Sequence, residues 1–530
     1  MDLITWKMRL LVPCLLLAIA ANCASSARIL AVLPSPAKSH QYVNQATLKA
    51  LAARGHQIVS YSPLTLDKPV PNYTEIHIEN KMAAGGGQMS LEVFMSFLDA
   101  SPVGGAKLLW KYTDVVLGNT FKDENIKKLI DSNEKFDLVV LETLFTQEAV
   151  VAFGHRFKAP VVNVHTFGSF GPVNSVSGNP LSLAYIPDYS FPYSDRMSLY
   201  ERFLNAYSVL SSLHYYYSTH LPIQEAIARS AFKDPSMPPL VDMLLNTSLT
   251  VTNINPYAHY SHPNSPNVVP VGGIHLSSER KPLPEALKKF LDDAKQGVIY
   301  LSLGSVVPEN ILPQEFFDNF INAFRRLPYK VLWKTTISIT QLPEKILTSK
   351  WIPQQDVLAH QNIVLFITHG GLLSQHEAIN AGVPVICIPI MGDQPMNAKF
   401  YEAREVGVKL NFNDLSEETI YTAVTTVLNT TKYKDNMARL SHLYRDQPNS
   451  PADRLVFWVE YLLRHGGAPH LRPASALLPW YQLYLIDILV LLVATALVCI
   501  LFTYFIIRKI YRLIFVRQKF EAFSSSKKKN

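Results

Sequence analysis

Short apolar runs rich in Val and Ile alternate with helix-length segments in the first half of this chain. Such runs lie at 28–33, 57–61, 136–142 and 160–165. Between the first two, a loop leads into a helical pattern over 41–54, which Gly55 ends. Because parallel strands need a crossover connection between them, this alternation predicts an α/β domain built on a parallel sheet.

The same alternation begins again in the second half. Apolar runs lie at 297–305, 330–334, 364–367 and 385–390. A helix is predicted over 372–381, with Gly370-Gly371 before it and Gly382-Val383-Pro384 after it. Residues 277–284 are polar and contain two prolines, which favours a linker. The pattern therefore predicts two α/β domains, over 28–276 and 285–447.

The two ends of the chain read as targeting and membrane segments. Residues 1–27 have two basic residues, an apolar run and then small residues, which is typical of a secretory signal cleaved after Ala27. Residues 485–507 are apolar except for Asp487, and as a helix they would be ~35 Å long, enough to span a bilayer. A basic tail over 508–530 follows. By the positive-inside rule the tail is cytosolic and the body lies across the membrane.

An amphipathic helix is expected within 448–484, between the second domain and the membrane segment. Three pieces of the first half are less regular: 85–87, 91–98, and 190–217 with its many tyrosines. Aromatic insertions of this kind suit an apolar acceptor pocket. Ordinary packing of core and loops is the alternative for most of them.

Charge and cysteine content narrow the function classes. The net charge is +7, but the tail from Arg508 holds eight basic residues and one acid, which leaves 41 of each elsewhere. Outside the tail the chain has no net charge, so the sequence does not indicate a basic surface that binds nucleic acid. Of four cysteines only Cys387 lies in the predicted luminal body, so no intrachain disulfide is expected there, and Cys387 is interpreted as a core residue.

Most of the candidate functional side chains lie in the stretch 351–397. Glycines 370 and 371 after a strand let the backbone approach a bulky group, and a helix N-terminus presents free N–H groups to an anion. Functional groups sit beyond the carboxyl ends of parallel strands. The candidates there are an aromatic for a base, a carboxylate for ribose hydroxyls and an Asp-Gln pair for a polyol: Trp351, Glu377, Asp393 and Gln394. Together they predict a nucleotide-sugar site.

This stretch resembles the signature of the UDP-glycosyltransferase family, with about fifteen typed positions at fixed spacing. The positions read Trp-x-Pro-Gln from Trp351, Thr-His-Gly-Gly from Thr368, Ser-x-x-Glu-Ala from Ser374, Gly-x-Pro from Gly382 and Asp-Gln-x-x-Asn from Asp393. The resemblance runs from near Arg28 to the C-terminus. It implies the GT-B fold, in which two Rossmann-like doubly wound domains face each other across a cleft, here with one C-terminal transmembrane helix. It also implies that the helix after the second domain crosses back onto the first.

The resemblance assigns donor roles residue by residue. Trp351 would stack on uracil, Gln354 would reach uracil or ribose, and Glu377 would accept from ribose hydroxyls. His369, Gly370, Gly371, Ser374 and Ser305 would surround the diphosphate. Asp393 and Gln394 would bind the sugar hydroxyls. The family often has Asn where this chain has Leu373, which implies one polar phosphate contact fewer.

Two residues of the first domain are candidates for the chemistry. His40 lies at a loop–helix junction after a strand, and an imidazole can take a proton from an attacking hydroxyl. Glu142 at the end of another strand would hold that imidazole. By resemblance His40 falls on the catalytic histidine of the family. Glu142 falls where many members carry Asp, and insect members often carry Glu.

The expected activity is inverting transfer of a sugar from a UDP-sugar to a hydroxyl of a small lipophilic acceptor, in a detoxification or conjugation role. No Asp-x-Asp motif occurs, and no metal or other cofactor is expected. Glucose is favoured over glucuronate as the donor sugar, because Glu142 and residues 372–374 look closer to insect members. A catalytically silent UDP-sugar-binding or carrier protein on the same fold is the alternative, and a homo-oligomer stays open.

The expected location is the endoplasmic-reticulum membrane, single-pass type I, with a luminal body. Lysines 527–529 before the last residue match a dilysine retrieval signal, and a solvated basic tail is the alternative. Sequons at Asn72, Asn246 and Asn429 would meet the glycosylation machinery in that orientation.

Overall fold

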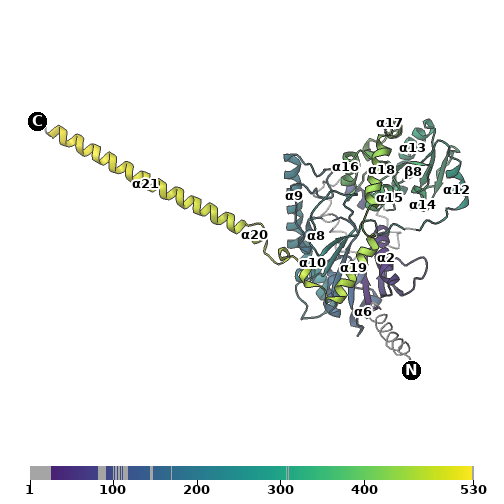
Figure 1. Cartoon of the computed structure of the whole chain (residues 1–530), viewed down its shortest axis with the longest axis horizontal. Helices are drawn as coiled ribbons and strands as arrows, with labels where there is room; N and C mark the ends of the chain where they lie inside the picture. Colours follow the sequence, from purple (N-terminus) through teal and green to yellow (C-terminus); the bar gives the residue numbers. More distant parts are fainter. Residues whose placement is uncertain are drawn as a thin grey trace, which may run out of the picture. The chain divides into compact units, whose positions relative to one another are not determined.

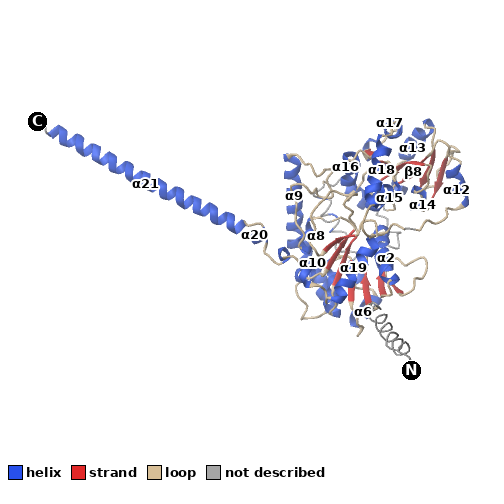
Figure 2. Cartoon of the chain, in the orientation of Figure 1, coloured by secondary structure: helices blue, strands red, loops and turns tan. Residues whose placement is uncertain are grey.

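The structure, a computed structural model, describes residues 26–80, 91–98, 117–143, 147–168, 170–277, 279–305 and 309–527, together with residues 101, 104, 108, 110 and 307. The chain divides into two compact units, one ending at Pro473 and one beginning at Ala474. The first contains both sheets, and the second contains the long helix α21 (Figures 1 and 2).

The first sheet has seven strands, and every neighbouring pair is parallel. In spatial order they are β3 (Tyr73–His77), β2 (Gln57–Ser62), β1 (Arg28–Val32), β4 (Leu138–Leu141), β5 (Val161–His165), β6 (Leu249–Thr252) and β7 (Val268–Pro270). Alternate side chains of β1 enter two different cores: Leu30 and Val32 one, Ile29 and Ala31 the other. Both faces are therefore covered, as a parallel sheet requires.

Helices cover this first sheet on either side. They are α2 (Lys38–Ala53), α6 (Glu124–Asp131), α7 (Ala152–Phe157), α8 (Gly171–Ser177), α9 (Leu199–Tyr215), α10 (Leu221–Phe232) and α11 (Leu240–Leu245). Helix α4 (Leu91–Leu98) belongs to the same half of the chain, but its buried Phe94 packs in the core of the second sheet. Helices α9 and α10 are joined through a π-helical turn over Tyr216–His220. The core on the α2 side also receives residues from much later in the chain, described below.

The second sheet has six parallel strands: β10 (Ile346–Ser349), β9 (Lys330–Lys334), β8 (Val298–Ser302), β11 (Ile363–Thr368), β12 (Val385–Cys387) and β13 (Gly407–Lys409), in that spatial order. Its helices are α12 (Glu285–Asp292), α13 (Gln314–Arg326), α14 (Gln354–Leu358), α15 (Leu372–Ala381), α16 (Gln394–Ala403), α17 (Glu417–Leu428) and α18 (Lys432–Arg445). In both sheets the strand order reverses beside the first strand, which is the doubly wound arrangement.

Helix α19 (Pro451–Arg464) follows the second domain but packs on the first. Its apolar stripe of Leu455, Val456, Val459 and Leu462 enters the core shared by α2, β1 and β4. Ser450 caps the helix by accepting from the Asp453 N–H at 3.1 Å. The return predicted from the amphipathic pattern is present, and it joins the two domains into one unit.

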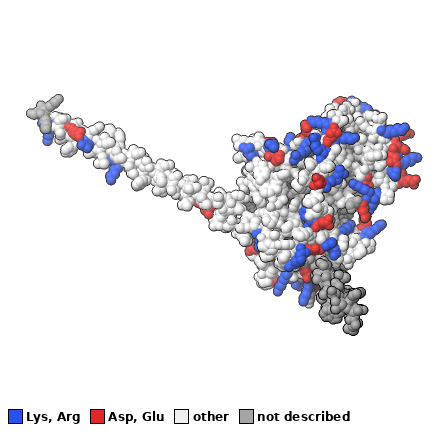
Figure 3. Space-filling model, viewed as in Figure 1, with Lys and Arg blue, Asp and Glu red and all other residues white. Residues whose placement is uncertain are grey.

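The second unit holds α20 (Trp480–Leu483) and α21 (Ile486–Lys527), whose described side chains are exposed. By length and composition α21 could cross a membrane. At 1.5 Å per residue its 42 residues extend ~63 Å, roughly twice the hydrocarbon thickness of a bilayer. Figure 3 shows its first part almost free of charge and its last part carrying Lys, Arg and Glu. The apolar span and the basic residues after it, as far as Lys527, are thus one continuous helix.

The two doubly wound domains predicted from the sequence are confirmed, and the predicted helix over 372–381 coincides with α15. The periodicity did not indicate β3, β6, β10 and β13, which are short or lie near a sheet edge. The interpretation of 190–217 as irregular was wrong, because most of it forms α9. Residues 85–87 lie outside the described part, as does the predicted signal except Ser26 and Ala27. The carbonyl of Ala27 accepts from the Gln57 N–H at 2.9 Å.

The α19 packing predicts a contrast between two positions on one helix. Leu462→Ala removes a fully buried side chain from the core shared with the first sheet and should lower the free energy of unfolding by about 2–5 kcal/mol. Phe457→Ala removes an aromatic that is 52% exposed and should cost under about 1 kcal/mol. Denaturation of the detergent-solubilised chain measures both, and equal destabilisation would show that α19 does not depend on this contact.

Candidate active site

His40 and Glu142 form a buried pair at the carboxyl end of the first sheet. His40 lies in the first turn of α2, and Glu142 directly follows β4. The His40 Nδ1 atom is 2.5 Å from the Glu142 Oε1 atom. Parallel pairing of β1 with β4 places the two strand ends side by side, so residues 102 positions apart in sequence come into contact.

Two further side chains hold the Glu142 carboxylate. The Thr166 hydroxyl, just after β5, donates to Oε1 at 2.8 Å, and the Asn44 amide donates to Oε2 at 2.8 Å. With His40 this makes three donors to a carboxylate that has no exposed surface, and hydrogen bonds are what make burial of a charge tolerable. When His40 Nδ1 carries the proton donated to Glu142, the lone pair of the neutral ring lies on Nε2. The longer Glu side chain therefore fits and orients the imidazole.

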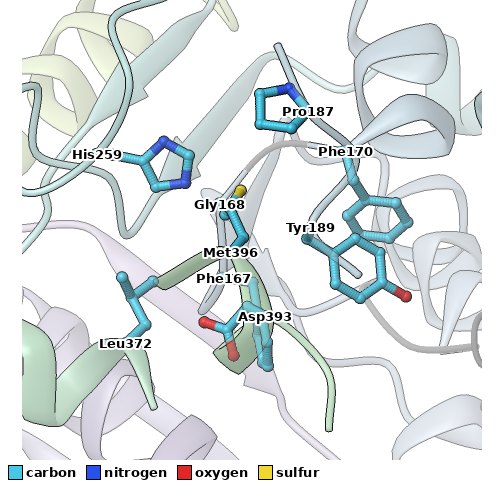
Figure 4. Close-up of a pocket in the computed structure, with 9 residues that line it drawn as sticks. All are labelled: Phe167, Gly168, Phe170, Pro187, Tyr189, His259, Leu372, Asp393 and Met396. Atoms are coloured by element: carbon cyan, nitrogen blue, oxygen red, sulfur yellow. The ribbon is translucent and has the colours of Figure 1, made fainter. Parts of the chain in front are cut away.

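An apolar pocket lies next to this pair (Figure 4). Its lining residues come from the segment after β5, from the loop before α9, from the 253–267 segment and from the second domain: Phe167, Gly168, Phe170, Pro187, Tyr189, His259, Leu372, Asp393 and Met396. His40 packs on one wall, with its ring 5.4 Å from the Phe167 ring. No residue of 190–217 lines this pocket.

Asp393 of the second domain lines the pocket together with residues of the first domain. This carboxyl follows β12 by a short loop, is 6% exposed and lines the pocket together with first-domain residues. Burial raises its pKa to about 6, and the hydrogen bond from Asn397 and the charge of His40 act in the opposite direction. His40 and Asp393 are therefore close enough to interact electrostatically, although they belong to different domains.

A glycine-rich turn at the start of α15 forms the opposite part of the site. Gly370 has φ +83°, and a Cβ there would lie 2.4 Å from the Cys387 sulfur. A Cβ on Gly371 would lie 2.6 Å from His369 Nε2. No side chain caps α15, whose N-cap is Gly371. Only glycines allow this turn, and it leaves the N-terminus of α15 open to an anion.

His369 is packed into this turn. A Cβ on Gly304, in the loop after β8, would lie 2.6 Å from its ring. Burial lowers the pKa of His369 to about 4, and the neighbouring Lys334 lowers it further. The imidazole is therefore neutral at physiological pH. The positive charge near the turn lies on Lys334, whose ammonium donates to the Gly304 carbonyl at 2.5 Å.

Trp351, after β10, is 65% exposed, so its ring is available for stacking and is not a core aromatic. Gln354 at the start of α14 is engaged by protein groups: its carbonyl accepts from the Tyr300 hydroxyl at 2.9 Å, and its amide donates to Ser374 and Glu377. Gln354 therefore positions the Glu377 carboxylate in this structure, and a direct contact with a ligand would require it to exchange those partners.

Glu377 lies on α15 among amide and imidazole groups. The Gln355 amide donates to it at 3.3 Å, and the His275 Nε2 atom lies 3.7 Å away. Burial raises the pKa of Glu377 to about 7, opposed by the bonds from Gln354 and Gln355. A carboxyl that titrates near neutrality can accept two ribose hydroxyls only when it is ionised.

Asp393 and the glycine turn are coupled through one residue. The Asn397 amide donates both to Asp393 at 2.9 Å and to the Gly370 carbonyl at 2.8 Å. The Gln394 side-chain carbonyl accepts from the Ile390 and Met391 N–H groups, and its amide nitrogen has no partner among the described residues. That amide can therefore donate to a ligand. The sequence motif contains Asn397, but only the tertiary structure shows that its amide contacts both Asp393 and Gly370.

The remaining candidates lie as follows. Ser374 is in the first turn of α15, and Ser305 follows Gly304. Leu373 packs against the core of the first domain, so an apolar contact between domains occupies the position where the family often has Asn. The side chains of Asn72, Asn246 and Asn429 are exposed. Cys387 is fully buried in β12, which confirms its interpretation as a core residue.

Two facing doubly wound domains, with a buried His–Glu pair on one and an open glycine-rich helix start on the other, define a glycosyltransferase of the GT-B class. A solved structure of Phytolacca americana UGT2, complexed with UDP-2fluoro-glucose and pterostilbene, shares this fold. Its TM-score is 0.55 at 16% identity, and the match covers 82% of this chain and 99% of that one.

Sequence relatives specify the family. The model of "UDP-glucoronosyl and UDP-glucosyl transferase" matches residues 30–522. UDP-glycosyltransferase UGT5 of Dactylopius coccus is 36% identical over 495 residues, which is 91% of this chain and 92% of the relative. Human UDP-glucuronosyltransferase 1A10 is 30% identical over 511 residues, 93% of each. The chain belongs to this family of enzymes, which transfer a sugar from a UDP-sugar, and α21 supplies a candidate membrane anchor.

Several residues of the site escaped the sequence analysis. Thr166, Asn44 and His259 stand in no recognised motif. The sequence carried a weak signal for two of them, because Asn44 lies one helical turn after His40 on α2 and Thr166 directly follows β5, whereas His259 reaches the pocket only through the tertiary fold. Lys334 offered a weak signal, as a lysine at the carboxyl end of a predicted strand, where functional groups of a parallel sheet gather.

The pKa of Glu377 predicts how donor affinity depends on pH. Its ionised fraction falls as pH drops through about 7, so the affinity for UDP-glucose should fall about tenfold from pH 8 to pH 6. Titration calorimetry at the two pH values measures this. Glu377→Gln should bind weakly and with little pH dependence, whereas Asp393→Asn, which removes the other carboxyl with a raised pKa, should keep most of the slope. An unchanged slope in Glu377→Gln would exclude Glu377 as the titrating group.

Proposed function

We propose that this enzyme transfers a sugar, by preference glucose, from its UDP conjugate to a hydroxyl of small lipophilic acceptors, with inversion and without a metal ion. The observation that carries the proposal is the buried His40–Glu142 pair next to an apolar pocket that Asp393 of the donor domain also lines. Base, acceptor space and donor-side carboxylate thus come together at one point between the domains.

His40 is the general base in this proposal. Its Nε2 atom takes the proton of the acceptor hydroxyl while the hydroxyl oxygen bonds to the anomeric carbon and the bond from that carbon to the UDP oxygen breaks. Glu142, held by Asn44 and Thr166, keeps the ring oriented and stabilises the imidazolium that forms. The electron pair of the broken bond leaves on the diphosphate.

The placement of the two half-sites supports inversion of the anomeric carbon in this proposal. An acceptor beside His40 and Phe167 attacks from the first domain, while the diphosphate leaves toward the start of α15 in the second. Single displacement from opposite faces inverts the anomeric carbon, so an α-linked donor gives a β-glycoside.

Protein groups offset the charge of the leaving diphosphate in this proposal. The open N-terminus of α15 supplies N–H groups and the positive end of the helix dipole. His369 is neutral and can only hydrogen-bond, so the cation is Lys334. Burial lowers the pKa of Lys334, with Glu309 opposing, and an anion bound beside the ammonium would relieve that desolvation.

The preference for glucose rests on likeness. A Dactylopius coccus relative named UDP-glucosyltransferase 2 is 34% identical to this chain, whereas human UDP-glucuronosyltransferase 1A10 is 30% identical. Conjugation of lipophilic compounds, an endoplasmic-reticulum location and a luminal body complete the proposal. The exposed sequon asparagines Asn72, Asn246 and Asn429 are compatible with that orientation.

Transfer assays test the base and the donor together. Microsomes containing the chain, given UDP-glucose or UDP-glucuronate and a simple phenol, should form the β-glucoside. His40→Ala should lower kcat about 10²–10⁴-fold while leaving UDP affinity unchanged. His442→Ala, an exposed histidine on α18, is the matched control. Activity that survives in His40→Ala would remove His40 as the base. UDP binding without any transfer would instead favour the silent carrier.

The proposed role of Lys334 predicts that its replacement weakens the binding of UDP but not the binding of uridine. Lys334→Met should weaken UDP binding about tenfold or more, because a hydrogen bond between charged groups contributes about 1.5–3 kcal/mol, and it should leave uridine binding unchanged. Lys334→Arg should retain most of the UDP affinity. Lys288→Met on α12 controls for loss of a lysine elsewhere. Equal losses for UDP and uridine in calorimetry would mean that Lys334 acts through the fold rather than on the diphosphate.

A further inference from the structure

Two consecutive glutamines at the start of α14 hold the two oxygens of the buried Glu377 carboxyl on α15, the helix on which α14 packs (Figure 1). The Gln354 amide donates to Oε2, and the Gln355 amide donates to Oε1 at 3.3 Å. A carboxylate offers about four lone-pair sites. One amide on each oxygen therefore leaves each oxygen able to accept a further hydrogen bond, which suits a ligand with two neighbouring hydroxyls.

The amide of Gln355 is itself fixed by the backbone. Its carbonyl oxygen accepts from the Ser277 N–H at 3.0 Å, and its amide also donates to the His275 carbonyl at 3.1 Å. Both partners belong to the segment that connects the first domain to the second. With the bond to Glu377, the carbonyl oxygen and both N–H groups of this amide are engaged. The main chain of the connecting segment thus keeps the Gln355 nitrogen facing Glu377.

The same connecting segment is fastened to α14 at two further points. The Arg280 guanidinium donates to the main-chain carbonyl of Gln355 at 2.9 Å, and the Lys281 N–H donates to the Asp356 carboxylate at 3.2 Å. A helix as short as α14, over Gln354–Leu358, has little stability of its own. The place of Gln355 therefore depends on chain that leaves the first domain, although Glu377 belongs to the second.

We propose that Gln355 is a positioning residue for donor binding, which turns the Glu377 carboxylate toward the 2′- and 3′-hydroxyls of the ribose and is itself held by the backbone of His275 and Ser277. Glu377 is the group that touches the donor, and Gln355 acts through it. The inference rests on the proposed transfer from a UDP-sugar whose ribose Glu377 binds. It adds a residue that follows directly after the Trp-x-Pro-Gln positions of the signature.

Glu377 is the group that titrates near neutrality among the described residues that face it. The neighbouring rings are those of His275, with Nε2 3.7 Å from Oε1, and His376, and burial lowers the pKa of these rings to about 4 and about 3. Both are therefore neutral. Burial raises the pKa of the tyrosine hydroxyls that interact with this carboxyl, on Tyr42, Tyr300 and Tyr444.

The bond from Gln355 acts on the ionisation of Glu377. Burial raises the pKa of Glu377 to about 7, and the bonds from the Gln354 and Gln355 side chains oppose that rise. Loss of the Gln355 bond should therefore raise this pKa further, because the bond stabilises the ionised form. At a fixed pH near 7 the ionised fraction would fall, and with it the ability to accept two hydroxyls.

A pair of ligands separates this role from a general effect on the fold. UDP and 2′,3′-dideoxy-UDP differ only in the two ribose hydroxyls, and both are titrated calorimetrically into the full-length, detergent-solubilised enzyme at pH 7. Gln355→Leu should lower the affinity for UDP about three- to tenfold, as expected for about one hydrogen bond. It should leave the affinity for the dideoxy compound unchanged. Gln314→Leu, which removes an amide donor to an exposed carboxylate at the start of α13, is the matched control and should alter neither affinity.

A second variant tests the electrostatic part without a change of size. Gln355→Glu keeps an acceptor for the Ser277 N–H but places a carboxylate oxygen where the amide donates to Glu377. The like charge should raise the pKa of Glu377, so the pH midpoint of UDP-glucose affinity should rise by at least about half a unit. Titrations between pH 6 and pH 8.5 measure this midpoint. A variant that only disturbed packing would lose the same factor in affinity at every pH.

Three results would count against the proposal, and they differ in what they remove. Equal losses for UDP and dideoxy-UDP in Gln355→Leu, or an unmoved midpoint in Gln355→Glu, would overturn the role of Gln355. So would a preference for UDP that Glu377→Ala abolishes and Gln355→Leu retains, which leaves the donor role of Glu377 intact. Wild-type enzyme that binds both ligands equally would remove Glu377 from the ribose, and the proposed donor site would fail together with this inference.

Discussion

The buried carboxylate of Glu142 is the constraint on which the first half of the site depends. A charge with no exposed surface needs several donors, and here they come from α2 and from the segment after β5. Meeting that need fixes the start of α2 against the ends of β4 and β5. The orientation of His40 is therefore a consequence of satisfying a buried charge, and the pocket beside Phe167 takes its place from the same arrangement.

Helix α15 links the two domains. Its N-terminus faces the expected diphosphate and its middle carries Glu377, while its other side holds the first domain. The Gln375 amide donates to the Ala258 carbonyl, and His376 lies between the Asn253 carbonyl at 3.2 Å and the Tyr444 hydroxyl at 3.0 Å. Burial lowers the pKa of His376 to about 3, so this link stays neutral. One helix thus connects the glycine turn of the second domain to the domain that carries His40 and Glu142.

The contact between domains is close at one further point. Gly273 has φ +88°, and a Cβ there would fall 2.2 Å from the Tyr444 hydroxyl. Together with the return of α19 onto the first sheet, this contact limits how far the domains can separate without breaking a packed core.

The sequence alone determined the two doubly wound domains and the family, and it named the donor-side residues as candidates. Strand and helix periods are local, and all donor candidates except Ser305 fall within about fifty positions of one another on consecutive elements. The sequence also indicated His40 and Glu142 one by one, because each follows a strand. Only the tertiary structure decided that they touch, that Thr166 and Asn44 complete the pair, and that His259 lines the pocket. Only burial showed that His369 is neutral beside Lys334, and that Tyr200 and Tyr207 are exposed on α9. Contacts between distant segments and the solvation of each group depend on how the elements pack, and no local pattern records that.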